Sequence, residues 1–337
     1  MSGPEAPGGN GGGDSVVLFD GVHLLSCVCQ GCLDKAEERA AQLEQFDAEG
    51  QDESASVIVQ NFSPSPQQPL TSNGLGPVGV PVSSYRPPVD SSDLSAFAAG
   101  LTQGSTLAGN TISYSFLGPG STGWWSQDTA AIGPYSWSST EKAQIRLALE
   151  QISGVANLNF VETSDNNMGA TFTFEHFYYN SGLVGVAGFP DMTPYGLPGF
   201  EGAVGLNTRF LGNEMALGQG GFGFSVTLHE LGHALGLKHT HDNGGTGAPT
   251  FPQLGFQAYD KQAYTVMSYN DPYPASSGYA GELGLLDIYT LHQLYGARAA
   301  NTGDDVYRSQ NYQQTIWDTG GIDTIDMSNG IGLSIYE

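Results

Sequence analysis

Three histidines, a glutamate and a glycine lie within eleven residues, in the order His229, Glu230, His233, Gly236 and His239. A helix advances about 100° per residue, so the first two histidines share one face and can hold one metal ion. Glu230 can reach a water molecule on that metal without occupying a coordination position. Gly236 can end the helix, which lets His239 approach the ion from another direction. Three imidazoles that leave one position open form a catalytic zinc site, so Zn²⁺ is the predicted cofactor.

The residues around these histidines predict the helix that carries them. A glycine-rich run over residues 218–223 precedes it, and Ser225 or Thr227 could cap its first turn. Its apolar side would consist of Val226, Leu231, Ala234 and Leu235. A core helix with hydrogen-bonded histidines is the alternative, but it accounts for neither the glutamate, nor Gly236, nor the third histidine.

The eleven residues follow the pattern H-E-x-x-H-x-x-G-x-x-H, the zinc-binding and catalytic signature of metzincin metallopeptidases. Residues 264–269, Tyr-Thr-Val-Met-Ser-Tyr, resemble the Met-turn of that clan in its serralysin form. The resemblance implies that Met267 packs beneath the metal site. It also implies that Tyr269 is a displaceable zinc ligand and stabilises the oxyanion.

The chain resembles a serralysin-type metallopeptidase from about Ser95 onward. The resemblance implies an α/β (α+β) fold, in which a mixed twisted sheet accompanies a long first helix and an active-site helix. Residues 203–207 sit where the family has its antiparallel edge strand, to which an extended substrate could add as a further strand. The sequence pattern favours helices over 139–150, with Ser139 as a cap, and over 285–296, and strands over 111–116, 159–163 and 170–174.

Two segments near the C-terminus resemble the start of the family's calcium-binding β-roll. Residues 302–307 and 317–324 combine carboxylates with glycine-rich backbone, which offers the hard oxygen ligands that Ca²⁺ prefers. Ordinary turn chemistry is the alternative explanation of such clusters. The family's nonapeptide repeats do not appear before Glu337, as expected of either a shortened chain or a natural variant. The candidate calcium ligands are Gly303, Asp304, Asp305, Asp318, Gly320 and Asp323.

Composition restricts the expected partners. Ten basic residues against 34 acidic ones give a net charge of −24, which argues against nucleic acid or an anionic membrane surface. No uninterrupted apolar run is long enough to span a bilayer. The resemblance implies protein or peptide substrates, and we expect a monomer. An N-terminal signal peptide is not expected, because no basic residue precedes Lys35; the resemblance implies secretion by a type I route.

Residues 1–95 differ from the rest and are predicted to be a propeptide with a Pro/Ser/Gly-rich linker. Residues 96–300 would then be the catalytic domain, and residues 301–337 the start of a truncated calcium-binding region. All three cysteines lie in this leader, as Cys27, Cys29 and Cys32. A thiolate is an excellent zinc ligand, so one of them could block the open coordination position and keep a zymogen inactive. A separate metal or redox cluster, or no special role, are the alternatives.

Together these features predict a secreted zinc endopeptidase in which Glu230 is the general base for water attack on a peptide bond. A catalytically silent zinc- or calcium-binding protein that engages a partner is one alternative. A zinc hydrolase of small esters or amides is another.

Overall fold

The computed structural model describes residues 94–328, apart from 128–130, 181–182, 196, 198, 211–216 and 271–277. It also describes the backbone of three short strands earlier in the chain: β1 (Val17–Phe19), β2 (Val22–Leu24) and β3 (Val57–Asn61). The three cysteines of the predicted latch lie outside the described residues. β1 and β2 pair with each other, whereas β3 pairs parallel with β11 (Gln314–Asp318), far along the chain.

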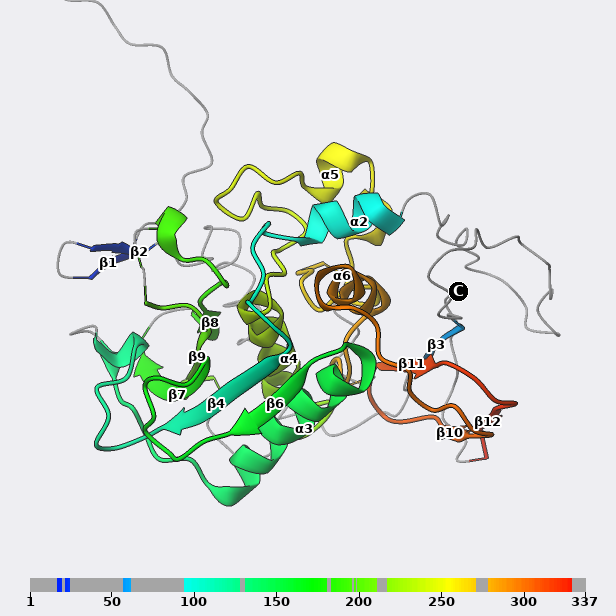
Figure 1. The fold of residues 1–337 in the computed structure, drawn as a ribbon, viewed down its shortest axis with the longest axis horizontal. Coiled ribbons are helices and arrows are strands. Elements are labelled where there is room, and N and C mark those ends of the chain that lie inside the picture. Colours follow the sequence, from blue (N-terminus) through cyan, green and yellow to red (C-terminus); the bar gives the residue numbers. More distant parts are fainter. Residues whose placement is uncertain are drawn as a thin grey trace, which may run out of the picture.

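A mixed sheet of the predicted kind forms one side of the described chain (Figure 1). Its main strands run in the spatial order β6-β4-β7-β9-β8, and β5 pairs with β7 outside this order. β4, β6, β7 and β9 are parallel, and β8 joins β9 antiparallel. The strands are β4 (Thr111–Leu117), β5 (Ala131–Ile132), β6 (Asn159–Glu162), β7 (Phe172–Tyr179), β8 (Gly185–Ala187) and β9 (Ala203–Asn207).

The strands predicted over 111–116, 159–163 and 170–174 are confirmed as β4, β6 and β7, although β7 begins two residues later and extends to Tyr179. The strand over 203–207 is also confirmed, as β9, but its assignment as the edge was wrong. β9 lies between β7 and β8, and all five of its residues are buried, as is typical of an interior strand. The antiparallel edge strand is β8 instead.

The longest helix, α3 (Ser139–Val155), confirms the predicted first helix. Its cap is Ser138 rather than Ser139: the Ser138 hydroxyl accepts a hydrogen bond from the Glu141 N–H, while the Glu141 carboxylate accepts one from the Ser138 N–H. Four apolar side chains form its buried face, namely Ile145, Ala148, Leu149 and Ile152.

The helix of the metal motif is α4 (Phe222–Ala234), which follows Gly221. The prediction that Ser225 or Thr227 caps it was wrong, because both lie inside the helix, where the Thr227 hydroxyl donates to the Gly223 carbonyl. The N-cap residue is Gly221. Its backbone is extended, and it has no side chain with which to cap the helix. The helix contacts α3 on one side and the strands β8 and β9 on another, so the motif lies against the edge of the sheet.

The remaining helices and strands lie on the side of α4 that faces away from β8 (Figure 1). α6 (Leu285–Tyr295) confirms the predicted last helix and contacts α2 (Leu94–Leu101), which in turn contacts α5 (Phe251–Leu254). Short 3₁₀ turns occupy Trp125–Gln127, Thr193–Tyr195 and Gln257–Tyr259. β10 (Val306–Arg308) pairs parallel with β12 (Thr324–Asp326) in the C-terminal region.

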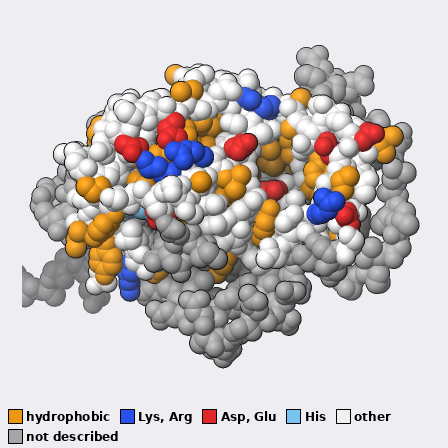
Figure 2. All heavy atoms as spheres, turned by 90° about the horizontal axis from the view of Figure 1, so that it is seen from below, with side chains coloured by type: hydrophobic (Ala, Val, Ile, Leu, Met, Phe, Trp, Pro, Cys, Tyr) orange, Lys and Arg blue, Asp and Glu red, His pale blue; other side chains and the backbone are white. Residues whose placement is uncertain are grey.

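Charged side chains of both signs lie close together on the face shown in Figure 2. Ion pairs in the described part of the chain join Lys142 to Asp165, Arg146 to Glu162 and Arg308 to Asp326. Among the described helices, none combines the length and the apolar character needed to cross a membrane.

Candidate metal centre

The end of α4 brings the three histidines of the motif together. His229 and His233 lie one turn apart on the helix, and the chain then turns at Gly236, whose φ is +97°. No residue with a side chain could replace this glycine, because a Cβ atom at this position would lie 2.4 Å from the Ser105 carbonyl oxygen. The turn places His239 opposite the helix, where it is fully buried.

The three imidazoles point the same nitrogen at a common centre. The Nε2 atom of His239 lies 3.0 Å from that of His229 and 3.1 Å from that of His233. In a tetrahedral zinc site with Zn–N bonds of about 2.0–2.1 Å, ligand nitrogens lie about 3.3 Å apart. The spacing therefore fits three ligands of a single small cation, and the three histidines form a group that could hold one.

The other nitrogen of each ring fixes its orientation. The Nδ1 atom of His229 lies 2.7 Å from the Val266 carbonyl, and that of His233 lies 2.8 Å from the Leu237 carbonyl. The Nδ1 atom of His239 lies 2.6 Å from the Asp242 carboxylate. An N–H that donates to each of these acceptors leaves Nε2 with its lone pair directed at the centre.

Burial favours the neutral form of His233, the form that metal ligation requires. The pKa of His233 is lowered to about 3, first by desolvation and then by the neighbouring His239. Burial would raise the pKa of the Asp242 carboxyl, but His239 and the Gly244 N–H together hold that pKa below its ordinary value. An ionised Asp242 beside His239 is thus favoured.

Glu230 directly follows His229 on α4 and is buried next to the edge of the sheet. Desolvation raises the pKa of its carboxyl to about 8. The neighbouring strand is β8, whose Gly185 approaches so closely that a Cβ there would lie 2.7 Å from the Glu230 Oε1 atom. The carboxyl group can therefore exchange a proton close to any chain that extends along this edge.

The predicted Met-turn contacts both α4 and the histidines. The Met267 side chain is fully buried and contacts α4 at Gly232, where a Cβ would lie 2.7 Å from the Met267 sulfur. The Tyr269 hydroxyl lies 2.8 Å from the His239 Nε2 atom, and its ring stacks on the His229 ring at 5.5 Å. The structure thus gathers Met267, Tyr269 and all five motif residues in one place.

Sequence reasoning missed the carboxylates that support this arrangement. Asp287 on α6 is fully buried and accepts hydrogen bonds from the Thr265 hydroxyl and from the N–H groups of Val266 and Gly284. It thereby fixes the turn whose Val266 carbonyl orients His229. Asp242 was missed as well, although its position three residues after a predicted ligand was a usable signal.

Asp260 is a third carboxylate of this kind. It is buried and accepts hydrogen bonds from the hydroxyl groups of Thr240 and Ser268. These two residues directly follow His239 and Met267 in the chain, so Asp260 ties the turn after the third ligand to the Met-turn.

The candidate calcium residues form a second group, at the C-terminal end of the described chain. Carboxylate oxygens of Asp305, Asp318 and Asp323 lie within 4.8 Å of one another, and we call these three residues the aspartate cluster. Asp304 is not part of this cluster; its carboxylate accepts a hydrogen bond from the Ile322 N–H. Gly303 and Gly320 belong to the two loops that meet here: the Gly303 carbonyl lies against Gly321, and the Gly320 N–H donates to Asp318.

Known proteins with related sequences are metallopeptidases. Serralysin of Proteus mirabilis is 32% identical over 225 residues, which cover 58% of this chain and 45% of the relative. Metalloprotease AprA of Pseudomonas entomophila is 31% identical over 247 residues, covering 65% and 49% respectively. Serralysin of Photorhabdus laumondii is 32% identical over 221 residues, covering 57% and 44%. The chain spans less than half the length of these relatives, and no family model matches it.

Proposed function

From the premise that this chain is of the serralysin type, we propose that it is a zinc-dependent endopeptidase. One observation carries the proposal: three histidine Nε2 atoms converge beside a buried glutamate at the edge of a sheet. His229, His233 and His239 would hold Zn²⁺. When bound there, the ion supplies an acidified water molecule and polarises a carbonyl group.

The chain's own residues supply the proton transfer and the substrate's position. Glu230 accepts a proton at its carboxylate and returns it to the leaving amine. A bound cation would oppose the desolvation that raises the pKa of this carboxyl, so the base form would be populated at neutral pH. Tyr269 donates a hydrogen bond from its hydroxyl to the developing oxyanion. An extended peptide would pair with β8, the antiparallel edge that adjoins Glu230.

Replacement of the general base tests the proposal. Glu230→Gln keeps the size of the side chain and leaves the three histidines intact, so the variant should bind one zinc per chain. Its digestion of casein should fall about 10³-fold or more, within the range that general acid–base groups contribute. Glu150→Gln, on the exposed side of α3, is the matched control and should digest casein normally. Substantial casein digestion by Glu230→Gln would contradict the role of this residue.

We propose further that the aspartate cluster binds Ca²⁺, with backbone oxygens from the loops of Gly303 and Gly320. Carboxylates that meet in glycine-rich turns supply the oxygen ligands that this cation prefers. Its role would be to stabilise the C-terminal region, since the cluster shares no residue with the metal centre.

The leader supports a proposal about maturation. We infer that the chain is secreted as a zymogen, and that Cys27, Cys29 or Cys32 blocks the open zinc position until the leader is removed. If so, the Cys→Ser change at the blocking position should produce activity before the leader is cut. Unchanged latency in all three single variants and in the triple variant would refute the latch.

A further inference from the structure

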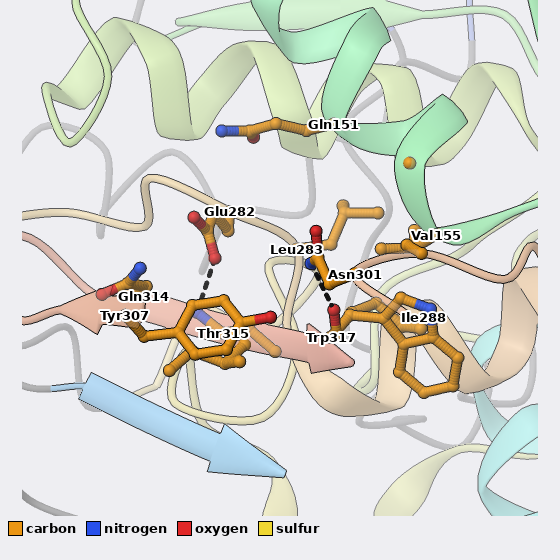
Figure 3. A pocket seen from close by; sticks show the side chains of 13 residues that line it. Gln151, Val155, Glu282, Leu283, Ile288, Asn301, Tyr307, Gln314, Thr315 and Trp317 are labelled. Carbon is orange, nitrogen blue, oxygen red and sulfur yellow. Dashed lines mark hydrogen bonds between the residues drawn. The ribbon is translucent and has the colours of Figure 1, made fainter. Parts of the chain in front are cut away.

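A second polar site lies apart from the metal centre, between the end of α3, the loop before α6, and β11. It is a cavity of about 220 Å³ (Figure 3). Gln151 and Val155 line it from α3, Glu282 from the loop, and Gln314 and Trp317 from β11. None of the three histidines, Glu230 or Tyr269 is among its lining residues.

Glu282 brings a carboxyl group into this cavity with little to stabilise its charge. Its Oε2 atom accepts a hydrogen bond of 2.8 Å from the Thr315 N–H. Burial nevertheless raises the pKa of this carboxyl to about 8, against the smaller opposing effect of the Thr315 N–H. Glu282 is half-buried and has no ion pair among the described residues, so a cation that entered the cavity would stabilise its charged form.

Two neutral acceptors lie in the same cavity. The Oε1 atoms of Gln151 and Gln314 are buried, and neither has a hydrogen-bond partner within the described residues. Buried acceptors are almost always satisfied in folded proteins, so two of them in a cavity that a carboxyl group also lines call for a donor from outside. Figure 3 shows the three side chains entering from separate elements.

The rest of the lining is largely apolar. Besides Val155 and Trp317, the side chains of Leu283, Ile288 and Ile316 contribute to it. A lone metal ion would leave this apolar surface uncovered and much of the volume unfilled. A hydrocarbon chain would cover the surface, and the indole ring of Trp317 could also attract a cation to its face.

We propose that this cavity binds a primary ammonium group on a short hydrocarbon chain, with Glu282 as its counter-charge and Gln151 and Gln314 as acceptors. An ammonium group has three N–H donors, which matches one carboxylate and two amide oxygens. The chemistry is that of a lysine side chain or a free alkylamine.

The ammonium group could come from the chain's own leader. β3 pairs with β11 so that Val57 lies opposite Gln314, which brings the leader next to a strand that lines the cavity. Lys35 is the only lysine that precedes Lys142 in the sequence. The experiment must therefore distinguish Lys35 from an amine supplied in solution.

Titration calorimetry of the full chain with n-butylammonium chloride tests the proposal, with 1-butanol as the neutral probe of equal chain length. The ammonium probe should bind and the alcohol should not. Glu282→Gln should weaken binding about tenfold or more, as expected for the loss of a charge-assisted hydrogen bond, and Glu150→Gln should leave it unchanged. Binding at pH 7 should also release protons, because the carboxyl group must ionise, so the heat should vary with the buffer's ionisation enthalpy.

The Lys35→Gln chain separates the two sources. If wild type binds the probe, the site accepts an external amine; if only Lys35→Gln binds it, the leader's lysine occupies the cavity. Absence of binding by both chains would overturn the proposal, as would calcium binding that Glu282→Gln abolishes. Gln151→Leu serves if Glu282→Gln does not fold, and it should also weaken binding. No peptide cleavage is measured, so the outcome is independent of the proposed peptidase function.

Discussion

The candidate metal centre and the aspartate cluster each gather three candidate ligands, but they are organised in different ways. At the metal centre each histidine is buried and its Nδ1 atom has a fixed acceptor, so the geometry exists before any ion arrives. In the aspartate cluster, Asp318 is buried, Asp305 is half-buried and Asp323 is exposed. Backbone N–H groups of neighbouring turns hold two of these carboxylates. The first site should therefore select its ion by geometry, whereas the second would be completed by its ion.

Loss of one ligand at the organised site should have the largest effect. His239→Ala removes the nitrogen that lies 3.0–3.1 Å from both others. We expect loss of stoichiometric zinc, measured by metal analysis after dialysis, and a fall of casein digestion of about 10³-fold or more. His292→Gln is the control, because His292 lies on α6 and bonds to the Val155 carbonyl. Full zinc occupancy in His239→Ala would show that the three rings do not act as one site.

Loss of an orienting partner should have a smaller effect. Asp242→Asn keeps the shape of the side chain but removes the charge beside His239 Nδ1. Such partners typically contribute 10- to 100-fold to metal affinity, so zinc competition with a chelator should reveal a loss of that size. Asp165→Asn, at an exposed surface pair, should have no effect. Equal zinc affinity in wild type and Asp242→Asn would mean that the organisation of the site does not depend on this contact.

Stability should respond to the buried carboxylate behind the Met-turn. Asp287→Ala leaves three donors unsatisfied and should lower the free energy of unfolding by about 2–4 kcal/mol, measured by urea denaturation. Asp305→Ala, at the half-buried member of the aspartate cluster, should lower the free energy of unfolding by less in the absence of calcium. The reverse order would contradict the distinction between the two regions.

The same carboxylate predicts a pH dependence. Burial raises the pKa of Asp287 from 3.8 to about 7, so between these values the folded chain binds a proton that the unfolded chain releases. This contribution to the free energy of unfolding is therefore present at low pH and is lost as the pH rises from about 4 to about 7. In Asp287→Asn that loss should disappear. If the free energy of unfolding changed with pH in the same way for wild type and Asp287→Asn, the shifted pKa would be contradicted.

The aspartate cluster should give the smallest effect, and only when calcium is present. At calcium about 100-fold above the Kd, a bound ion stabilises a protein by about 2.7 kcal/mol. Asp323→Asn should reduce the rise in Tm on calcium addition and leave zinc content unchanged. Asp304 directly precedes Asp305 but is not part of the cluster, so Asp304→Asn should keep most of the calcium-dependent rise in Tm. An equal loss in both variants would indicate a general charge effect instead of a site.

The parts of the site that the sequence could predict are local. The spacing of His229 and His233 follows from helical geometry, and Gly236 signals the turn toward His239. The Val266 carbonyl lies 37 residues from His229 and the Asp287 carboxylate 21 residues from Val266, so no local pattern reveals their contacts.

The fold shows the same limit. The length and apolar periodicity of α3 made it predictable, whereas the edge strand β8 has only three residues, which is too short for a recognisable alternation. The longer β9 was mistaken for it. The start of α4 was missed because its cap is Gly221, which carries no side-chain signal.

The contact of Asp287 with Val266 has a consequence for the timing of activity. Through Val266 it links the last helix of the described core to the ring of His229. A chain emerging from the ribosome cannot make this link before residue 287 has been synthesised and α6 has docked. Under the proposed function, a supported hydrolytic centre would thus arise only when this part of the chain is nearly complete, and unfinished chains should be poor proteases.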